Sequence, residues 1–209
     1  MVDKGVVIVV SGPSGSGKST ICSYILKENG SSFGLVVSHT SRVPREGEVD
    51  GIHYHFLSKE VFLENKKNGL YLEWAEVHGN LYGTPIDQVE DSVAKQKNII
   101  LEIDVQGGLQ VKAKMPEAVL IFVSPPSYKE LENRLRGRQT DSDEVIVKRL
   151  ENAVGEMQKI KQYDYFIINK DLQVAINDVI LIGTTERKRV LRLNLNEIFD
   201  SMRFPKFQK

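Results

Sequence analysis

Residues 12–19 read Gly-Pro-Ser-Gly-Ser-Gly-Lys-Ser and match the pattern G-x-x-x-x-G-K-[ST] at every position. The apolar residues 6–10 before this stretch predict a buried strand, and residues 20–29 after it predict a helix. A glycine-rich loop in this context lets several backbone N–H groups point at one anion, and the helix N-terminus adds partial positive charge. The stretch therefore predicts a phosphate-binding loop for a nucleoside triphosphate.

Two side chains of this loop have predicted roles. Lys18 is expected to reach the outer phosphates, and the Ser19 hydroxyl is expected to ligate Mg²⁺. The residues predicted to surround the triphosphate are Gly12, Pro13, Ser14, Gly15, Ser16, Gly17, Lys18, Ser19 and Thr20. The alternative is a turn that binds nothing, and both the complete spacing and the strand–helix context argue against it. The loop by itself does not identify the phosphate acceptor.

Length and composition set broad limits on the class of protein. A chain of 209 residues allows one domain with inserted subdomains, and 28 basic residues balance 28 acidic ones, so no overall field draws the chain to nucleic acid or membrane. Cys22 is the only cysteine, which excludes an internal disulfide, and it is expected to be a small core residue. With no signal-like segment and no apolar run of bilayer length, a soluble cytoplasmic protein is expected.

Apolar strands that alternate with helices predict a P-loop α/β fold with a doubly wound parallel sheet. The strands of this core are expected at 4–10, 35–38, 98–104, 119–124 and 165–169. The predicted core comprises residues 1–37, 86–126 and 163–190.

Three other regions differ in composition from this core. Residues 38–85 contain fewer apolar residues and predict an inserted mixed α+β module. Residues 127–162 predict a lid of two helices rich in charged residues. The tail, residues 191–209, favours a helix that packs on the core or on another subunit over a frayed end.

The first polar cluster lies in the inserted module, where residues 38–48 read SHTSRVPREGE. Arg42 and Arg45 stand three residues apart in a proline-containing turn and can converge on one phosphate, each as a fork of donors. Tyr54 can add a hydroxyl, and Glu48 can hold an arginine in place. The alternative is a solvated charged loop. If the cluster is functional, it binds a second phosphate.

Glu73 stands in an otherwise apolar strand, where an unpaired carboxylate is costly. A carboxylate offers two acceptors side by side and guanine offers two donors, at N1 and N2, whereas adenine has an acceptor at N1. Ser38 or Thr84 can serve the guanine O6. The alternatives are a glutamate paired with a neighbouring lysine and one on the solvated face of the strand.

Two further clusters flank the expected reaction centre. Glu102 and Asp104 follow a buried strand at its carboxyl end, where open α/β sheets bind ligands, and they can hold Mg²⁺ through water, meet a second substrate or cap the next helix. Arginines on the two lid helices can swing over a phosphate chain, or form a solvated basic face. These arginines are Arg134, Arg136, Arg138 and Arg149. The four histidines lack the spacing of a structural zinc site.

In combination, five motifs resemble the guanylate kinase family: GPSGSGKST, SHTSRVPREGEVDGIHYHF, EWAEVHGNLYGT, LEIDVQG and LRGRQTDSDEVIVKRL. The resemblance runs from about residue 6 to residue 169. It implies reversible transfer of the ATP γ-phosphoryl to GMP, with dGMP as a further expected acceptor, and Mg²⁺ bound with ATP. Gln139, where the family often has glycine, and Ser41, where it usually has threonine, depart from the pattern without removing a charge.

The resemblance also implies a role for each matching residue. Lys18, Arg42, Arg138 and Arg149 would neutralise charge on the transferring group, and Arg134, Arg138 and Asn169 would join the loop in binding ATP. The residues assigned to GMP are Ser38, Arg42, Arg45, Glu48, Tyr54, Glu73, Tyr82, Thr84, Glu102, Asp104 and Arg149. The expected state is a monomer or homodimer, with no nucleic-acid or membrane partner. Two alternatives stay open: a kinase for another monophosphate such as AMP or dTMP, and a phosphopeptide-binding scaffold module of the same fold.

Overall fold

The computed structural model describes residues 4–77, 79–95, 97–137 and 142–203. Its larger sheet has five strands in the order β2-β7-β1-β8-β9, and every neighbouring pair is parallel. The strands are β1 (Val7–Ser11), β2 (Phe33–Gly34), β7 (Asn98–Glu102), β8 (Val119–Ser124) and β9 (Tyr165–Ile168). The predicted doubly wound α/β fold is confirmed.

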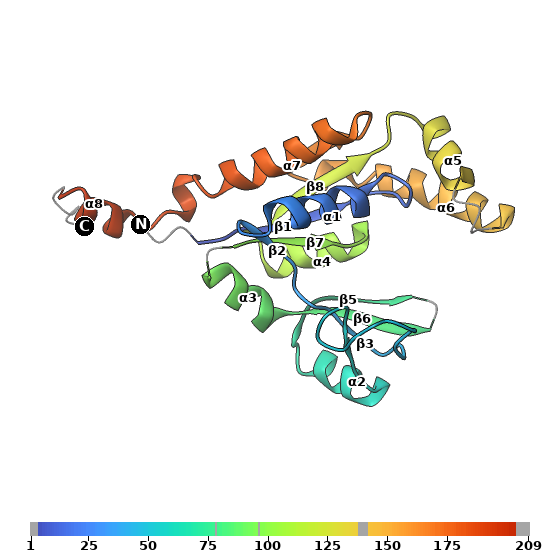
Figure 1. Cartoon of the computed structure of the whole chain (residues 1–209), viewed down its shortest axis with the longest axis horizontal. Helices are drawn as coiled ribbons and strands as arrows, with labels where there is room; N and C mark the ends of the chain where they lie inside the picture. The colour runs from blue at the N-terminus through green and yellow to red at the C-terminus, as the bar shows by residue number, and fades with distance from the viewer. Residues whose placement is uncertain (1–3, 78, 96, 138–141, 204–209) are drawn as a thin grey trace.

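Helices cover both faces of this sheet, as Figure 1 shows. Alternate residues of β1 point to opposite faces, so Ile8 packs in the cluster under helices α1 (Lys18–Asn29) and α7 (Leu172–Glu186). Val9 packs in the cluster under α3 (Ile86–Ala94) and α4 (Val105–Lys114). Because both faces are covered, β1 is buried throughout and is apolar from Val7 to Val10.

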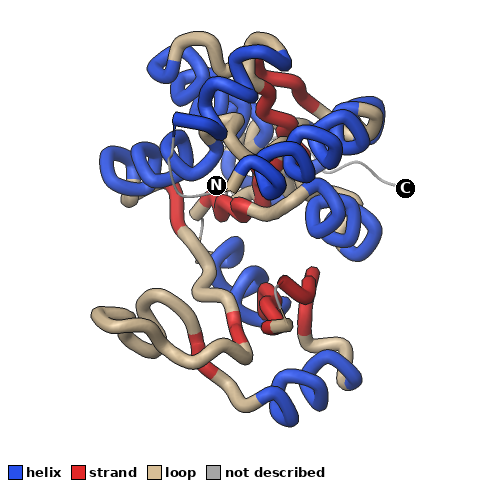
Figure 2. Tube along the Cα trace, turned by 90° about the vertical axis from the view of Figure 1, so that its right-hand side faces the viewer, coloured by secondary structure: helices blue, strands red, loops and turns tan. Residues whose placement is uncertain are grey.

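The second sheet lies beside the α4 face of the core and has the order β4-β3-β6-β5 (Figure 1). Its strands are β3 (His39–Thr40), β4 (His55–Phe56), β5 (Tyr71–Val77) and β6 (Asn80–Pro85). The tube in Figure 2 shows that loop makes up much of this lower part of the molecule. Helix α2 (Lys59–Lys67) begins at the cap Ser58, whose Oγ accepts a hydrogen bond from the Val61 N–H at 3.3 Å. Phe62, Tyr71 and Leu81 form the small core of this sheet.

The strand predicted at residues 35–38 is wrong. The core strand here is β2, which ends at Gly34, and Leu35 is 56% exposed. After Gly34 the chain leaves the parallel sheet and runs to β3 in the second sheet. The apolar residues 35–37, which suggest a buried strand, instead form the connection between the two sheets. The strand β6, which pairs antiparallel with β5, was also absent from the predicted elements.

The two lid helices pack on each other. Helix α5 (Tyr128–Gly137) and helix α6 (Asp143–Met157) bury Leu131, Leu135 and Ile146 between them. Helix α6 begins after its cap Ser142, and the short helix η1 (Ile160–Gln162) leads on to β9. The buried apolar side chains of these charged helices therefore lie in the contact between the two helices.

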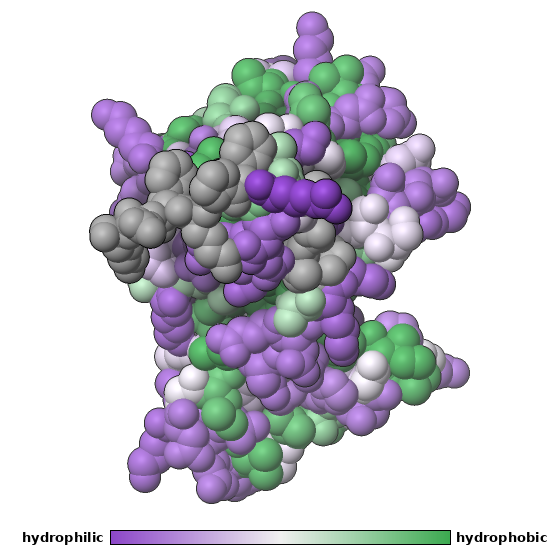
Figure 3. All heavy atoms as spheres, turned by 90° about the vertical axis from the view of Figure 1, so that its left-hand side faces the viewer, coloured by the Kyte–Doolittle hydropathy of each residue, from purple (hydrophilic) through white to green (hydrophobic). Residues whose placement is uncertain are grey.

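The C-terminal segment contains η2 (Val190–Arg192) and α8 (Leu195–Ser201), so the helix expected in the tail is present. Arg192 ties η2 to the core, donating to the Glu117 carbonyl at 2.6 Å and to the buried Glu186 carboxylate at 3.1 Å. No residue of α8 is buried. Figure 3 views the molecule from the side where α8 lies in Figure 1, and the surface on this side mixes hydrophilic with hydrophobic side chains. None of the helices in the described part of the chain is long and apolar enough to cross a bilayer.

Two helix glycines should respond oppositely to alanine. A Cβ at Gly183 would lie 2.6 Å from Ile8 Cδ1 and 3.1 Å from the Phe33 ring, whereas a Cβ at Gly155 would meet no atom within 4 Å. We expect Gly183→Ala to destabilise the protein by about 1 kcal/mol, because overpacking (~1–3 kcal/mol) exceeds the gain in helix propensity (~1 kcal/mol). Gly155→Ala should stabilise it by roughly 0.5–1 kcal/mol. Urea unfolding measures both; a stable Gly183→Ala variant would contradict the packing described.

Candidate active site

The phosphate loop follows β1 directly and takes a shape that only glycines permit. Gly12, Gly15 and Gly17 have φ values of 139°, 91° and 95°. A Cβ on Gly12 would lie 2.1 Å from the Val123 carbonyl oxygen of β8, so any side chain there would push β1 and β8 apart. The predicted strand–loop–helix unit is therefore present, with α1 beginning at Lys18.

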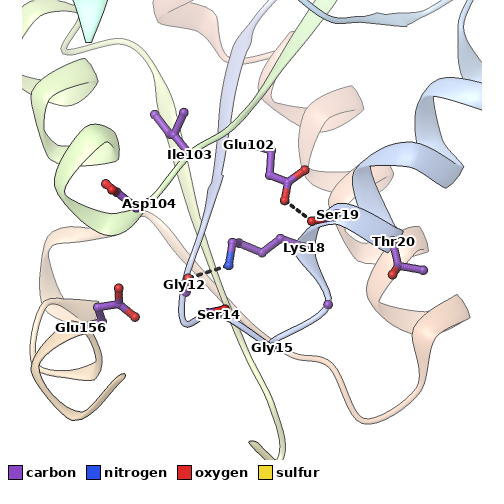
Figure 4. Close-up of a pocket in the computed structure, with 11 residues that line it drawn as sticks. Gly12, Ser14, Gly15, Lys18, Ser19, Thr20, Glu102, Ile103, Asp104 and Glu156 are labelled. Atoms are coloured by element: carbon purple, nitrogen blue, oxygen red, sulfur yellow. Dashed lines mark hydrogen bonds between the residues drawn. The ribbon is translucent and has the colours of Figure 1, made fainter. Parts of the chain in front are cut away.

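Lys18 and Ser19 point into a pocket of about 320 Å³ (Figure 4). The Lys18 ammonium donates hydrogen bonds to the carbonyls of Gly12 (2.6 Å) and Pro13 (2.9 Å), and the Ser19 hydroxyl donates to Glu102 Oε1. The lining residues are Gly12, Ser14, Gly15, Gly17, Lys18, Ser19, Thr20, Glu102, Ile103, Asp104 and Glu156. Glu102, expected on the side of the second substrate, thus contacts the hydroxyl expected to bind metal.

A second pocket of about 220 Å³ lies between the two sheets. It is lined by Ser38, Tyr54, Glu73, Ala75, Val77, Tyr82, Gly83, Glu102, Ile103 and Asp104. Residues 102–104, at the carboxyl end of β7, line both pockets. A phosphate chain in the first pocket and a ligand in the second would therefore meet at this segment.

Arg42 is held at the outer side of the second pocket by Glu48. Its Nη2 donates to both carboxylate oxygens of Glu48, at 2.7 and 2.9 Å, and its guanidinium lies 5.8 Å from the Tyr54 ring centroid. The Arg45 N–H also donates to Glu48 (2.7 Å), and these donors lower the pKa of Glu48 to about 2. Tyr54 and Tyr82 pack edge to face, and the Arg45 side chain is exposed. The loop is thus internally bonded, as predicted for Glu48.

Glu73 is only 6% exposed, so the alternative that it lies on a solvated face is wrong. Its Oε1 accepts a hydrogen bond from Thr84 at 2.6 Å, and burial raises the pKa of its carboxyl, with the nearby Asp104 raising it further. Asp104 caps α4, accepting from the Gly107 N–H at 2.7 Å, so the predicted capping interaction is present. Ser38 lines the same pocket and is half-buried.

Helices α5 and α6 each send one arginine toward the phosphate loop, to Ser14 and to the neighbouring Asn169. Arg149 of α6 donates to the Ser14 hydroxyl at 2.7 Å, and Arg134 of α5 donates to the Asn169 carbonyl at 3.0 Å. The Asn169 side chain in turn donates to the Ser16 carbonyl at 2.8 Å. Arg136 instead pairs with Glu132 and Asp143. Arg138, with the departure at Gln139, lies outside the described residues.

This geometry is matched by known proteins over nearly the whole chain. A profile of the family described as "Guanylate kinase" matches residues 4–182. The chain belongs to the guanylate kinase family. Guanylate kinases of Carboxydothermus hydrogenoformans (45% identical, 94% of this chain and 96% of the relative) and Clostridioides difficile (47%, 91% and 93%) are similar to it. The crystal structure of guanylate kinase from Anaplasma phagocytophilum matches with a TM-score of 0.75 at 33% identity, covering 98% of each chain.

Within this guanylate kinase fold, the structure adds Glu156 to the predicted site residues. It lines the phosphate-loop pocket from α6, and burial raises the pKa of its carboxyl although Lys18 lowers it (Figure 4). Glu156 follows Arg149 by seven residues, so both lie on one face of the helix. That spacing is the only signal in the sequence that could have identified it.

Two other side-chain predictions concern metal and nucleophile chemistry. Among the described residues no cluster of histidine, cysteine and acidic side chains could hold a metal ion, although the rings of His39 and His55 lie 5.4 Å apart. Cys22 is 2% exposed, and burial raises the pKa of its thiol to about 12. It is the core residue that was expected and not a nucleophile.

We predict that Glu73→Gln stabilises the folded protein at neutral pH. A carboxyl whose folded pKa is raised favours folding below its ordinary pKa and loses that contribution as the pH rises through the raised value. The amide keeps the acceptor for Thr84 and avoids the buried charge. The melting temperature of the variant should therefore exceed that of the wild type at neutral pH, and the difference should vanish below the ordinary pKa of 4.5.

Glu76→Gln, at an exposed position of the same strand, is the matched control and should leave the melting temperature unchanged. A Glu73→Gln protein that melts below the wild type at neutral pH would show that the pocket stabilises the ionised carboxylate.

Proposed function

We propose that this chain acts as a guanylate kinase, transferring the γ-phosphoryl group of ATP to GMP and releasing ADP and GDP. One observation carries the proposal: two polar pockets share the wall formed by residues 102–104. The first has the glycine-rich loop that suits a triphosphate. The second combines the buried Glu73 carboxylate with Tyr54, whose ring centroid lies 5.8 Å from the Arg42 guanidinium. Family membership agrees with this assignment.

ATP would bind with its phosphates along residues 12–20. Lys18 would exchange the loop carbonyls for phosphate oxygens, which compensate its charge better than neutral carbonyls do. We place the adenine beside Arg134 and Asn169, which are hydrogen-bonded to each other, and Arg149 already reaches the loop at Ser14. Arg149 would therefore move only from a loop atom to phosphate oxygens, with Arg138 as a further proposed ligand of the phosphates.

Mg²⁺ would be held with the ATP phosphates by Ser19 and, directly or through water, by Glu102. Both are hard oxygen donors in mutual contact, which fits the preference of this ion. When bound, the ion supplies neutralisation of charge on the phosphate oxygens.

GMP would occupy the second pocket. Arg42, Arg45, Tyr54 and Tyr82 would hold its phosphate, with Glu48 keeping Arg42 in place. Glu73 would accept hydrogen bonds from guanine N1 and N2, while Thr84, bonded to Glu73 Oε1, orients the carboxylate. Ser38 and Asp104 line the remaining walls and would contact the base or its surroundings.

The chemical step needs no general base, because a phosphate oxygen of GMP is already anionic at neutral pH. This oxygen would attack the γ-phosphorus in line, and the ADP oxygen would leave. Catalysis would come from positioning and from cationic side chains around the transferring group, Lys18, Arg42, Arg138 and Arg149. Closure of the lid and of the second sheet over the pockets would exclude water, which otherwise competes as acceptor.

The experiment that tests this function measures ADP release with each nucleoside monophosphate offered in turn. GMP should support turnover far better than AMP, dTMP or CMP, with dGMP as the next acceptor. A preference for AMP or dTMP would identify a kinase for another monophosphate. ATP and GMP binding without ADP release would identify a binding module.

Lys18→Met should lower kcat by about 10²–10³-fold, the loss typical when one electrostatic contact to a transition state is removed. The fold should persist, because the hydrogen bonds from Lys18 to Gly12, Pro13 and Ser16 lie within its own loop. Lys27→Met, on the exposed end of the same helix, is the matched control and should retain full turnover. Near-normal kcat in Lys18→Met with an unchanged melting temperature would contradict the assigned role of the loop.

A further inference from the structure

Helix α4 of the core is hydrogen-bonded to the backbone of β5, the strand that carries Glu73. The Gln110 side-chain amide makes two bonds to the Trp74 backbone: its Oε1 accepts from the Trp74 N–H at 3.3 Å, and its Nε2 donates to the Trp74 carbonyl at 3.2 Å. One helical turn later, Lys114 Nζ donates to the Tyr71 carbonyl at 2.6 Å. Residues four apart share a helix face, so the two side chains form one clamp on β5.

The clamp spans an irregularity in the strand. The register of β5 against β6 shifts between Tyr71 and Glu73, and such a bulge re-aims the side chains that follow it. The ladder to β6 is disrupted at Leu72, so the residue immediately before Glu73 has no register partner on β6. Lys114 binds the backbone before the bulge and Gln110 binds it after, one residue beyond Glu73.

The same helix also forms one side of the space around the Glu73 carboxylate. A Cβ at Gly107 would stand 3.2 Å from Glu73 Oε2, so the first turn of α4 lies against this oxygen. Asp104, the cap of α4, lines both pockets. Helix α4 lies between the larger sheet and β5 (Figure 1), so its contacts fix Glu73 relative to the core that holds the phosphate loop.

We propose that Gln110 is a positioning residue for base selection: by holding the Trp74 backbone on the far side of the bulge, it fixes the direction of the Glu73 carboxylate and so sets the preference for guanine. Lys114 secures the near side. This inference rests on the proposed function, because it explains a preference for GMP as the phosphate acceptor. Gln110 acts through the strand and does not itself contact the nucleotide.

The test uses Gln110→Met, which preserves length and helix propensity but removes both hydrogen bonds. Steady-state kinetics are compared with GMP and with inosine monophosphate, which lacks the 2-amino group and so offers Glu73 one donor where guanine offers two. We expect the KM for GMP to rise about tenfold, the size of effect expected when one hydrogen bond between the Glu73 carboxylate and guanine is misaligned. The kcat/KM for inosine monophosphate should fall less, and the KM for ATP should not change, so the preference for GMP shrinks.

Gln173→Met, at an exposed site of α7 where the side-chain amide donates to Asn177 Oδ1 at 3.1 Å, is the matched control and should leave every kinetic constant unchanged. Lys114→Met removes the other half of the clamp and should likewise reduce the preference for GMP over inosine monophosphate. If Gln110→Met fails to fold, the ratio of kcat/KM for GMP to that for inosine monophosphate in Lys114→Met decides whether the clamp sets the preference.

A folded variant that keeps the wild-type preference, or that raises the KM values for GMP and ATP equally, would overturn the role of the clamp. Failure of the proposed function looks different, because the wild-type protein itself would then release no ADP in response to GMP.

Discussion

The close approach of two backbones at Gly12 is the constraint on which the rest of the structure depends. The Val123 carbonyl of β8 occupies the space that a Cβ at residue 12 would need, so β1 can turn sharply into the phosphate loop beside β8. That turn sets the start of α1 at Lys18 and brings Ser19 to the carboxyl end of β7. Parallel strands end at one edge of the sheet, and both pockets meet there.

A second constraint is the buried carboxylate between the two sheets. Burial opposes the charge of Glu73, while one hydroxyl and the edge of α4 orient it. A buried carboxylate of this kind lowers the stability of the fold, because it loses the hydrogen bonds that water donates to it in the unfolded chain. In the proposed complex guanine would replace them with its own N–H donors, so the lost stability serves recognition of the base. The loop between Arg42 and Glu48 differs, since Glu48 already compensates the charge of Arg42 near the surface.

Much of the site was accessible from the sequence because its signals are local. Residues 12–19 identify the loop, and the carboxylate of Asp104 was expected to cap a helix that the structure contains. The loop between Arg42 and Glu48 was predicted to be internally bonded because its partners are six residues apart. In contrast, the strand expected at 35–38 failed, because apolar residues look alike whether they lie in a sheet or cross between two sheets.

The sequence by itself determined the phosphate loop, the alternation of strands and helices, and the chemical character of each cluster, because these follow from backbone freedom and side-chain type over short stretches. Only the tertiary structure decided that Glu102 contacts Ser19, that Glu156 lines the same pocket, and that α4 clamps β5 through Gln110. Each of these contacts joins segments that are distant in the chain. Their distances are set by how helices and strands pack, and no local pattern of residues encodes that packing.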